Sequence, residues 1–143
     1  MNGQSAVPAK PVPAITPLNE PFWCAAAEGK LCLQRCLDCG HVRFPLGPVC
    51  TECLSERTEW AEMSGRGRVL CHLVFHQVYH PAWRADVPYS VIQVQLDEGP
   101  RLFSNVDDPT HADIGTDLVG RRVEAVFETV ADGIGLHRFR VVD

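Results

Sequence analysis

An alternation of apolar and polar positions runs through the second half of the chain and predicts β-strands. The candidate strands are rich in Val, Phe, Tyr and Leu and are separated by turn residues. Five segments show this pattern, at residues 69–79, 89–96, 101–105, 123–128 and 137–142. Two connections, Asp-Glu-Gly-Pro at 97–100 and Ala-Asp-Gly at 131–133, are typical of the tight turns of β-hairpins.

The spacing of these strands favours one closed barrel. Five short strands, with a longer connection at 106–120 before the fourth, match a five-stranded OB-type Greek-key barrel. We therefore predict a mainly β chain in which residues 61–143 form a C-terminal OB-fold domain. An apolar-polar alternation at 31–35 predicts one more strand, which leads into a separate segment at 31–60.

The first 30 residues have a different pattern. Residues 1–17 are rich in Pro, Ala, Gly and Ser and are predicted to be a flexible tail, or an arm that a partner orders. Within residues 18–30, Asn19 as N-cap and Gly29 as a stop predict a helix at 20–28. A helix of about nine residues is stable only when it is docked on the barrel or on another chain.

Composition and charge narrow the class of protein. The chain has 143 residues, of which 45% are apolar and 22% charged, which is typical of one folded domain with a small appendage. The net charge of −5 disfavours nucleic acid as a partner. No apolar stretch approaches the roughly 20 residues of a membrane span, and the N-terminus lacks a secretory pattern, so we expect a cytoplasmic protein without a membrane partner.

Four of the seven cysteines form two Cys-x-x-Cys pairs that are ten residues apart, and this spacing predicts one tetrahedral structural zinc ion. Four thiolates leave no open coordination position, which argues against Lewis-acid catalysis. Iron in a redox centre and a pair of disulfides are the less favoured alternatives. The predicted ligands are Cys36, Cys39, Cys50 and Cys53. The other three are interpreted as small buried apolar side chains: Cys24, Cys32 and Cys71.

Three histidines recur every four residues, two in the strand predicted at 69–79 and one just after it. Along a strand, four residues separate two side chains by roughly 13 Å, so these imidazoles cannot share one metal ion. Strict alternation assigns four apolar residues to the core, Val69, Cys71, Leu73 and Phe75. It assigns the histidines to the outer face, His72, His76 and His80.

Several motifs make the chain resemble the DUF35 family of acyl-CoA-associated proteins, from about residue 18 to the end. They are Pro-Phe-Trp at 21–23, the cysteine segments at 33–45 and 50–53, and the barrel segments at 64–69, 87–91, 96–102 and 135–140. One departure is Thr51, because a proline commonly follows the third zinc cysteine in the family. The resemblance implies an N-terminal helix, a rubredoxin-like zinc ribbon at residues 31–60 and a C-terminal OB-fold.

The resemblance also implies a function. Family members accompany thiolase-fold enzymes, such as acyl-CoA thiolases and sterol-side-chain aldolases, or hotdog-fold enoyl-CoA hydratases. We therefore expect a non-catalytic accessory subunit in a hetero-complex that helps form the acyl-CoA site of a thiolase-like subunit. Four apolar residues near the helix and ribbon are the predicted partner contacts, unless they pack on their own barrel: Phe22, Trp23, Phe44 and Pro45.

Two segments are candidates for contacts with acyl-CoA. Arg66 and Arg68 flank Gly67, where the alternatives are a tight turn or a contact with CoA phosphates. The segment at 80–86 carries Trp83 and Arg84, where the alternatives are a lip over the acyl chain or a Trp83 that is tucked under the barrel.

Other functions are less favoured. The sequence has no nucleophile elbow, phosphate-binding glycine loop or dinucleotide fingerprint, so an autonomous hydrolase or hydratase lacks a recognisable catalytic set. OB-folds and zinc ribbons also bind single-stranded nucleic acid, but such proteins need a basic groove, and this chain is acidic.

Overall fold

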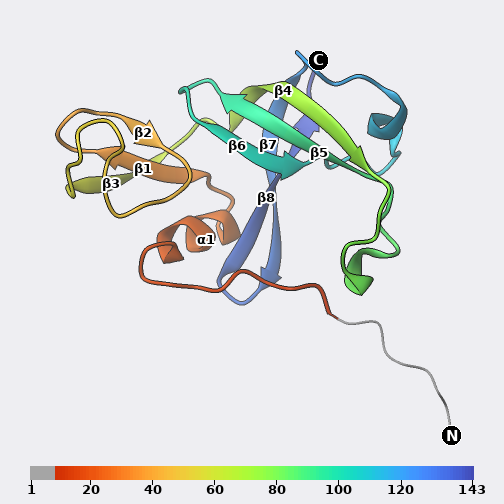
Figure 1. The fold of residues 1–143 in the computed structure, drawn as a ribbon, viewed down its shortest axis with the longest axis horizontal. Helices are drawn as coiled ribbons and strands as arrows, with labels where there is room; N and C mark the ends of the chain where they lie inside the picture. Colours follow the sequence, from red (N-terminus) through yellow and green to blue (C-terminus); the bar gives the residue numbers. More distant parts are fainter. Residues whose placement is uncertain (1–8) are drawn as a thin grey trace, which may run out of the picture.

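The structure is a computed structural model that describes residues 9–143, so residues 1–8 of the predicted tail lie outside the described residues. It is mainly β with one α-helix, as predicted (Figure 1). The elements are α1 (Glu20–Ala27), β1 (Cys32–Cys36), β2 (Val42–Arg43), β3 (Thr58–Glu62), β4 (Arg66–Phe75), η1 (Pro81–Trp83), β5 (Tyr89–Leu96), β6 (Arg101–Asn105), η2 (Ala112–Gly115), β7 (Arg122–Ala131) and β8 (Ile134–Val141). No helix in this part of the chain is long and apolar enough to cross a bilayer.

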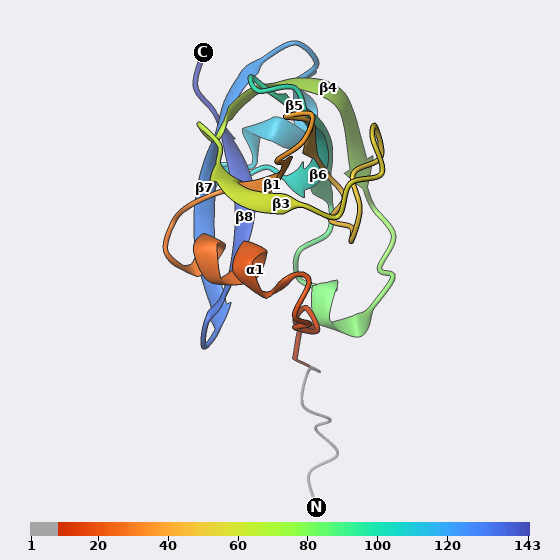
Figure 2. The ribbon, with the colours of Figure 1, turned by 90° about the vertical axis from the view of Figure 1, so that its left-hand side faces the viewer.

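The C-terminal strands form the predicted OB-fold barrel. They pair in the order β6-β5-β4-β7-β8, and every pair in this sheet is antiparallel. The two outer strands, β6 and β8, then approach each other (Figures 1 and 2). A parallel bridge joins Val106 to Phe139, and the Ser104 hydroxyl donates to the His137 carbonyl at 2.9 Å. These contacts close the sheet into a barrel.

The predicted strand bounds are correct for β5 and β6, but three others need correction. The strand expected at 69–79 runs from Arg66 to Phe75, because residues 76–88 leave the sheet for a loop that contains η1. β7 and β8 both extend to the hairpin turn, where Gly133 has a φ of +70°. This conformation suits glycine, as the Asp-Gly pair predicts.

A β-bulge in β4 overturns the predicted assignment of its faces. The register shifts between Val69, opposite Val94, and Cys71, opposite Gln93, so one extra residue enters the strand. Every later side chain therefore changes face. His72 lies opposite the buried Ile92 and points inward. The residues predicted to be in the core beyond Val69 point outward: Cys71, Leu73 and Phe75.

The small N-terminal sheet has the order β2-β1-β3 and lies beside the barrel (Figure 1). Its buried residues Leu33 and Ala61 belong to the same apolar cluster as the barrel residues Ile92 and Phe139. The Met63 amide also donates to the Leu31 carbonyl at 2.7 Å, at the point where the sheet leads into β4. The ribbon and the barrel therefore share one core.

Helix α1 packs on β7 and β8 (Figure 2). Its buried residues are Phe22 and Ala26, and β8 presents Gly135 to the helix backbone. Gly29 ends the helix with a φ of +81°, as predicted. Asn19 precedes the helix, but its side chain accepts from the Thr16 amide at 2.8 Å and makes no capping bond to the helix. The helix is thus held by docking on its own barrel.

Candidate functional site

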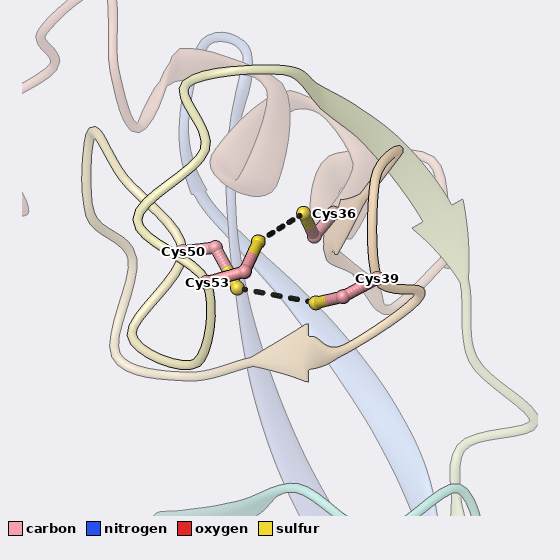
Figure 3. A group of neighbouring side chains, drawn as sticks. All are labelled: Cys36, Cys39, Cys50 and Cys53. Carbon is pink, nitrogen blue, oxygen red and sulfur yellow. Dashed lines mark hydrogen bonds between the residues drawn. The ribbon is translucent and has the colours of Figure 1, made fainter.

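The four predicted metal ligands meet at one end of the ribbon. Their sulfur atoms all lie within 4.8 Å of one another. The Sγ atoms of Cys36 and Cys53 are 3.5 Å apart, and those of Cys39 and Cys50 are 3.6 Å apart (Figure 3). A zinc ion with bonds of about 2.3 Å to each sulfur requires edges of about 3.8 Å, so the set fits a tetrahedral zinc ion. These separations are far from the roughly 2.05 Å of a disulfide.

The two halves of the centre are built alike. The Gly40 amide donates to the Cys36 carbonyl at 2.9 Å, and the Leu54 amide donates to the Cys50 carbonyl at the same distance. Gly40 has a φ of +79° and Leu54 a φ of +65°. Each knuckle therefore turns through a left-handed residue just after its second cysteine. Leu54 is a rare non-glycine in this conformation.

Backbone amides favour the thiolate form at the buried cysteine of each pair. The Cys39 amide is the largest influence on Cys36 and helps to lower the pKa of that thiol to about 6. Burial raises the pKa of Cys50, but the amides of Cys53 and Glu52, together with hydrogen bonds to the side chains of Cys39 and Cys53, outweigh it and the net shift is downward. Thiolates are the form that binds zinc. Zinc would tie the loop between β2 and β3 to β1, and four protein ligands give it a structural role.

A buried arginine that was not predicted lies in the same small sheet. Arg43 is 4% exposed, and its Nη2 donates to the Gly47 carbonyl at 3.0 Å and to the Thr58 hydroxyl at 2.9 Å. Gln34 is also buried and accepts from the Gly47 amide at 2.9 Å. Together they connect β1, β2 and β3. Arg43 and Gln34 are polar residues in alternating strands, and nothing in the sequence marks them as buried connections between strands.

The four predicted partner contacts differ in how deeply they are buried in the structure. Phe22 is 2% exposed and contacts Trp23, Phe44 and His137 with ring centroids 4.8, 5.9 and 5.7 Å apart. For Phe22 the structure favours the alternative of packing on its own barrel, because its side chain is already covered by its own chain. Trp23 and Phe44 are partly buried against the same cluster, and Pro45 is exposed.

A cleft of about 550 Å³ opens at the other end of the molecule, where β5 begins and β6 ends. Its walls come from these strands, from the loop around η1, and from the connection that contains η2. Of the four predicted acyl-CoA contacts, only Trp83 lines this cleft. Arg66 and Arg68 lie at the start of β4. Seven residues of strand, about 23 Å, separate Arg68 from the end of β4. Arg84 is exposed beside η1.

A buried hydrogen-bond chain leads into the cleft and was not predicted. The Ser90 hydroxyl donates to Asp113 Oδ2 at 2.5 Å and lies 2.9 Å from His72 Nε2. The three residue types are those of a hydrolase triad, but the order differs, because in a triad the histidine lies between the serine and the carboxylate. Here Ser90 lies in the middle and donates its hydroxyl hydrogen bond to Asp113 and not to the histidine. The histidine therefore does not activate Ser90 as a nucleophile. The bulge in β4 brings His72 to this position.

Comparisons with known proteins agree with both halves of this architecture. Residues 23–59 match the family model of the ChsH2 rubredoxin-like zinc ribbon domain, and residues 60–128 match that of the ChsH2 C-terminal OB-fold domain. A DUF35 domain-containing scaffold protein of Methanothermobacter thermautotrophicus is 33% identical over 100 residues, which cover 69% of this chain and 72% of that protein. This chain belongs to the DUF35 family. The zinc ribbon, the OB-fold and the resemblance predicted from the sequence are thereby confirmed.

Two further relatives are informative. A solved structure described as an Ltp2-ChsH2(DUF35) aldolase contains a chain with a TM-score of 0.75 and 33% identity, and the match covers 90% of this chain and 98% of that one. A probable enoyl-CoA hydratase alpha subunit of Thermomonospora curvata is 37% identical over 118 residues. That match covers 81% of this chain but 36% of the subunit, so this chain spans about a third of its length.

Proposed function

We propose that this chain is a non-catalytic accessory subunit that binds a thiolase-fold enzyme, a thiolase or a sterol-side-chain type of aldolase, and helps form its acyl-CoA site. The observation that carries the proposal is the match to the DUF35 chain of an aldolase, because it extends over 98% of that chain. Relatives described as scaffold proteins also support a role in assembly.

The arrangement of polar groups also favours an accessory role. The Ser90 hydroxyl lies 2.9 Å from His72 Nε2, but it donates its hydrogen bond to Asp113. The metal centre has four protein ligands and so offers no position to a substrate. The chain's own residues therefore hold the ribbon and shape a surface, and the partner would supply the nucleophile and the acid-base groups.

The acyl-CoA contacts of this proposal come from two separate places. Arg66 and Arg68 are exposed on the same side of β4, since the buried Gly67 lies between them, and they suit the phosphates of CoA. Trp83 suits an uncharged part of the ligand, because large apolar side chains at a cleft bind apolar groups. The distance along β4 means that these groups serve different parts of the complex.

Co-expression with a thiolase-fold enzyme of the same organism tests the proposal. We expect the two proteins to elute together in size-exclusion chromatography, and we expect acyl-CoA cleavage by the complex but not by this chain alone. The matched control is the enzyme purified without this chain. Separate elution, together with full activity of the enzyme alone, would overturn the proposal.

A second candidate is a subunit of a hotdog-fold enoyl-CoA hydratase. The 37% identity to the Thermomonospora hydratase subunit favours it. Because this chain spans about a third of that subunit, the rest of such an enzyme would have to come from another chain. Hydration of an enoyl-CoA by the chain with a co-purified hotdog-fold protein, and no association with a thiolase-fold protein, would favour this candidate.

A further inference from the structure

The outer side of the barrel carries an exposed apolar surface, which we call the outer face and define as Leu73, Phe75, Tyr79, Tyr89 and Phe103. The bulge in β4 turns Leu73 and Phe75 outward, and Tyr89 lies opposite Phe75. The exposed fractions of Leu73, Tyr79 and Phe103 are 49%, 69% and 60%. The Phe75 ring lies 5.8 Å from that of Tyr79 and 5.5 Å from that of Tyr89. Exposed clusters that are rich in Tyr and Phe are typical of protein interfaces.

The cleft continues this face, since Tyr89 and Phe103 also line it. Two basic side chains lie in its walls, and a carboxylate pairs with each of them. Lys10 Nζ lies 2.9 Å from Asp86 Oδ2 and 5.9 Å from the centre of the Trp83 ring. Arg138 Nη2 lies 2.7 Å from Glu128 Oε2. Neither base therefore gives the cleft a net positive charge.

Three aspartates of the cleft have no basic partner within 4.0 Å among residues 9–143. Asp113 is 6% exposed and is bonded to the neutral Ser90 hydroxyl. Asp108 accepts from the Thr110 hydroxyl at 2.6 Å and from the Thr110 amide at 2.9 Å, which lowers the pKa of its carboxyl. Asp107 is exposed. Asp107 and Asp108, which lie nearer the solvent than Asp113, therefore give the cleft uncompensated negative charge.

We propose that the outer face and the cleft together dock a partner protein that presents apolar side chains around an arginine or lysine, which enters the cleft. The aspartates supply charge-assisted hydrogen bonds to such a cation. A desolvated arginine among aromatic residues is a usual anchor of an interface. The same charges oppose phosphate, so neither CoA phosphates nor a nucleic-acid backbone suits this cleft.

The identity of the partner as a thiolase-fold enzyme rests on the proposed function, whereas the chemistry of the surface does not. The first test therefore needs no partner. Full-length isotope-labelled chain is titrated with ethylguanidinium and, separately, with inorganic phosphate, and amide and indole signals are followed by NMR. We expect ethylguanidinium to shift the signals of Trp83 and of residues 107–113, and phosphate to leave them in place. Shifts with phosphate alone, or with neither ion, would overturn the proposal.

The second test measures the affinity of the complex. Phe103→Ala should weaken association about tenfold to thirtyfold, because it truncates an exposed aromatic anchor. The double variant D107N/D108N should weaken it by about tenfold and reduce its dependence on salt, since Asn keeps the hydrogen-bond acceptor but removes the charge. The matched controls are Val142→Ala, at a residue 50% exposed elsewhere, and Asp132→Asn in the exposed turn between β7 and β8.

The possible results separate the two proposals. A wild-type chain that does not associate with the thiolase-fold enzyme contradicts the proposed function, and the NMR titration still decides the chemistry of the cleft. A wild-type chain that associates, while Phe103→Ala and D107N/D108N bind as tightly as the controls, contradicts the docking surface alone. Thermal unfolding of each variant checks that these surface substitutions leave the folded state unchanged.

Discussion

Gly135 sets the distance between helix α1 and the barrel, so its replacement by alanine should undock the helix. A Cβ at this position would overlap the carbonyl carbon of Ala26 and the amide nitrogen of Ala27, and would lie 2.6 Å from the Ala26 oxygen. All three are backbone atoms, which cannot rotate away as a flexible side chain does. The helix must therefore retreat from β8.

Two limits bound the cost of this retreat. Overpacking of a core by one methyl group costs about 1–3 kcal/mol. Complete undocking would expose Phe22, which is 2% exposed in the structure, and loss of a buried Phe side chain costs about 3–5 kcal/mol. Since α1 has 8 residues, it has little stability of its own to offset this loss. We expect a destabilisation of about 2–4 kcal/mol, or a fall in Tm of about 6–12 °C for a chain of this size.

Thermal and urea unfolding of the zinc-loaded protein measure this effect, and hydrogen exchange of residues 20–27 locates it. The matched control is Gly115→Ala, because a Cβ at Gly115 meets no atom within 4 Å. The two variants add the same methyl group to the unfolded chain, so the difference between them reports the folded state. A Gly135→Ala protein with the Tm of the control and full protection of α1 would refute the reasoning.

Three other outcomes follow from the same structure. Cys39→Ser should lose the zinc ion, measured by elemental analysis, and hydrogen exchange should quicken in the ribbon while β5 and β6 stay protected. Phe22→Ala should lower stability by about 3–5 kcal/mol in urea unfolding, more than Trp23→Ala, because Phe22 is the more deeply buried of the two. Burial lowers the pKa of His137 below its ordinary 6.5, so the unfolded chain binds the proton first and stability falls as the pH falls below about 6.5. His137→Leu should flatten that part of the stability profile, and an unchanged slope would contradict the assignment.

The sequence predicted those features that depend on local pattern or on fixed ligand chemistry. β5 has strict alternation of buried residues, so its bounds follow from the sequence alone. The zinc ribbon follows from four cysteines, because two Cys-x-x-Cys pairs have few other uses in a small β segment. The Asp-Gly turn before Ile134 is likewise a local signal.

The features that were missed depend on pairing between distant strands. The bulge after Val69 is set by the register of β4 against β5, and nothing in the local alternation marks it. It places His72 inside and Leu73 outside, and so creates both the hydrogen-bond chain at Ser90 and the outer face. The sequence left Phe22 between a partner and its own barrel for a related reason, since an amphipathic helix does not show whether its apolar side meets its own barrel or another chain.

The charges at the two ends of β4 differ, so the two proposed surfaces favour different ligands. At one end of β4, Arg66, Arg68 and Arg122 lie on the same side. Two carboxylates accompany them: Asp97, held to Arg122 by two bonds of 2.8 Å, and Glu124, which lies opposite Arg66 and 4.0 Å from Arg140. This hydrogen bonding lowers the pKa of Asp97, so the group is a stable ion pair with a surplus of positive charge. The other end of the strand faces the acidic cleft. An anionic ligand is therefore favoured at the first end and a basic protein surface at the second, and both ends can be engaged at once because the strand keeps them apart.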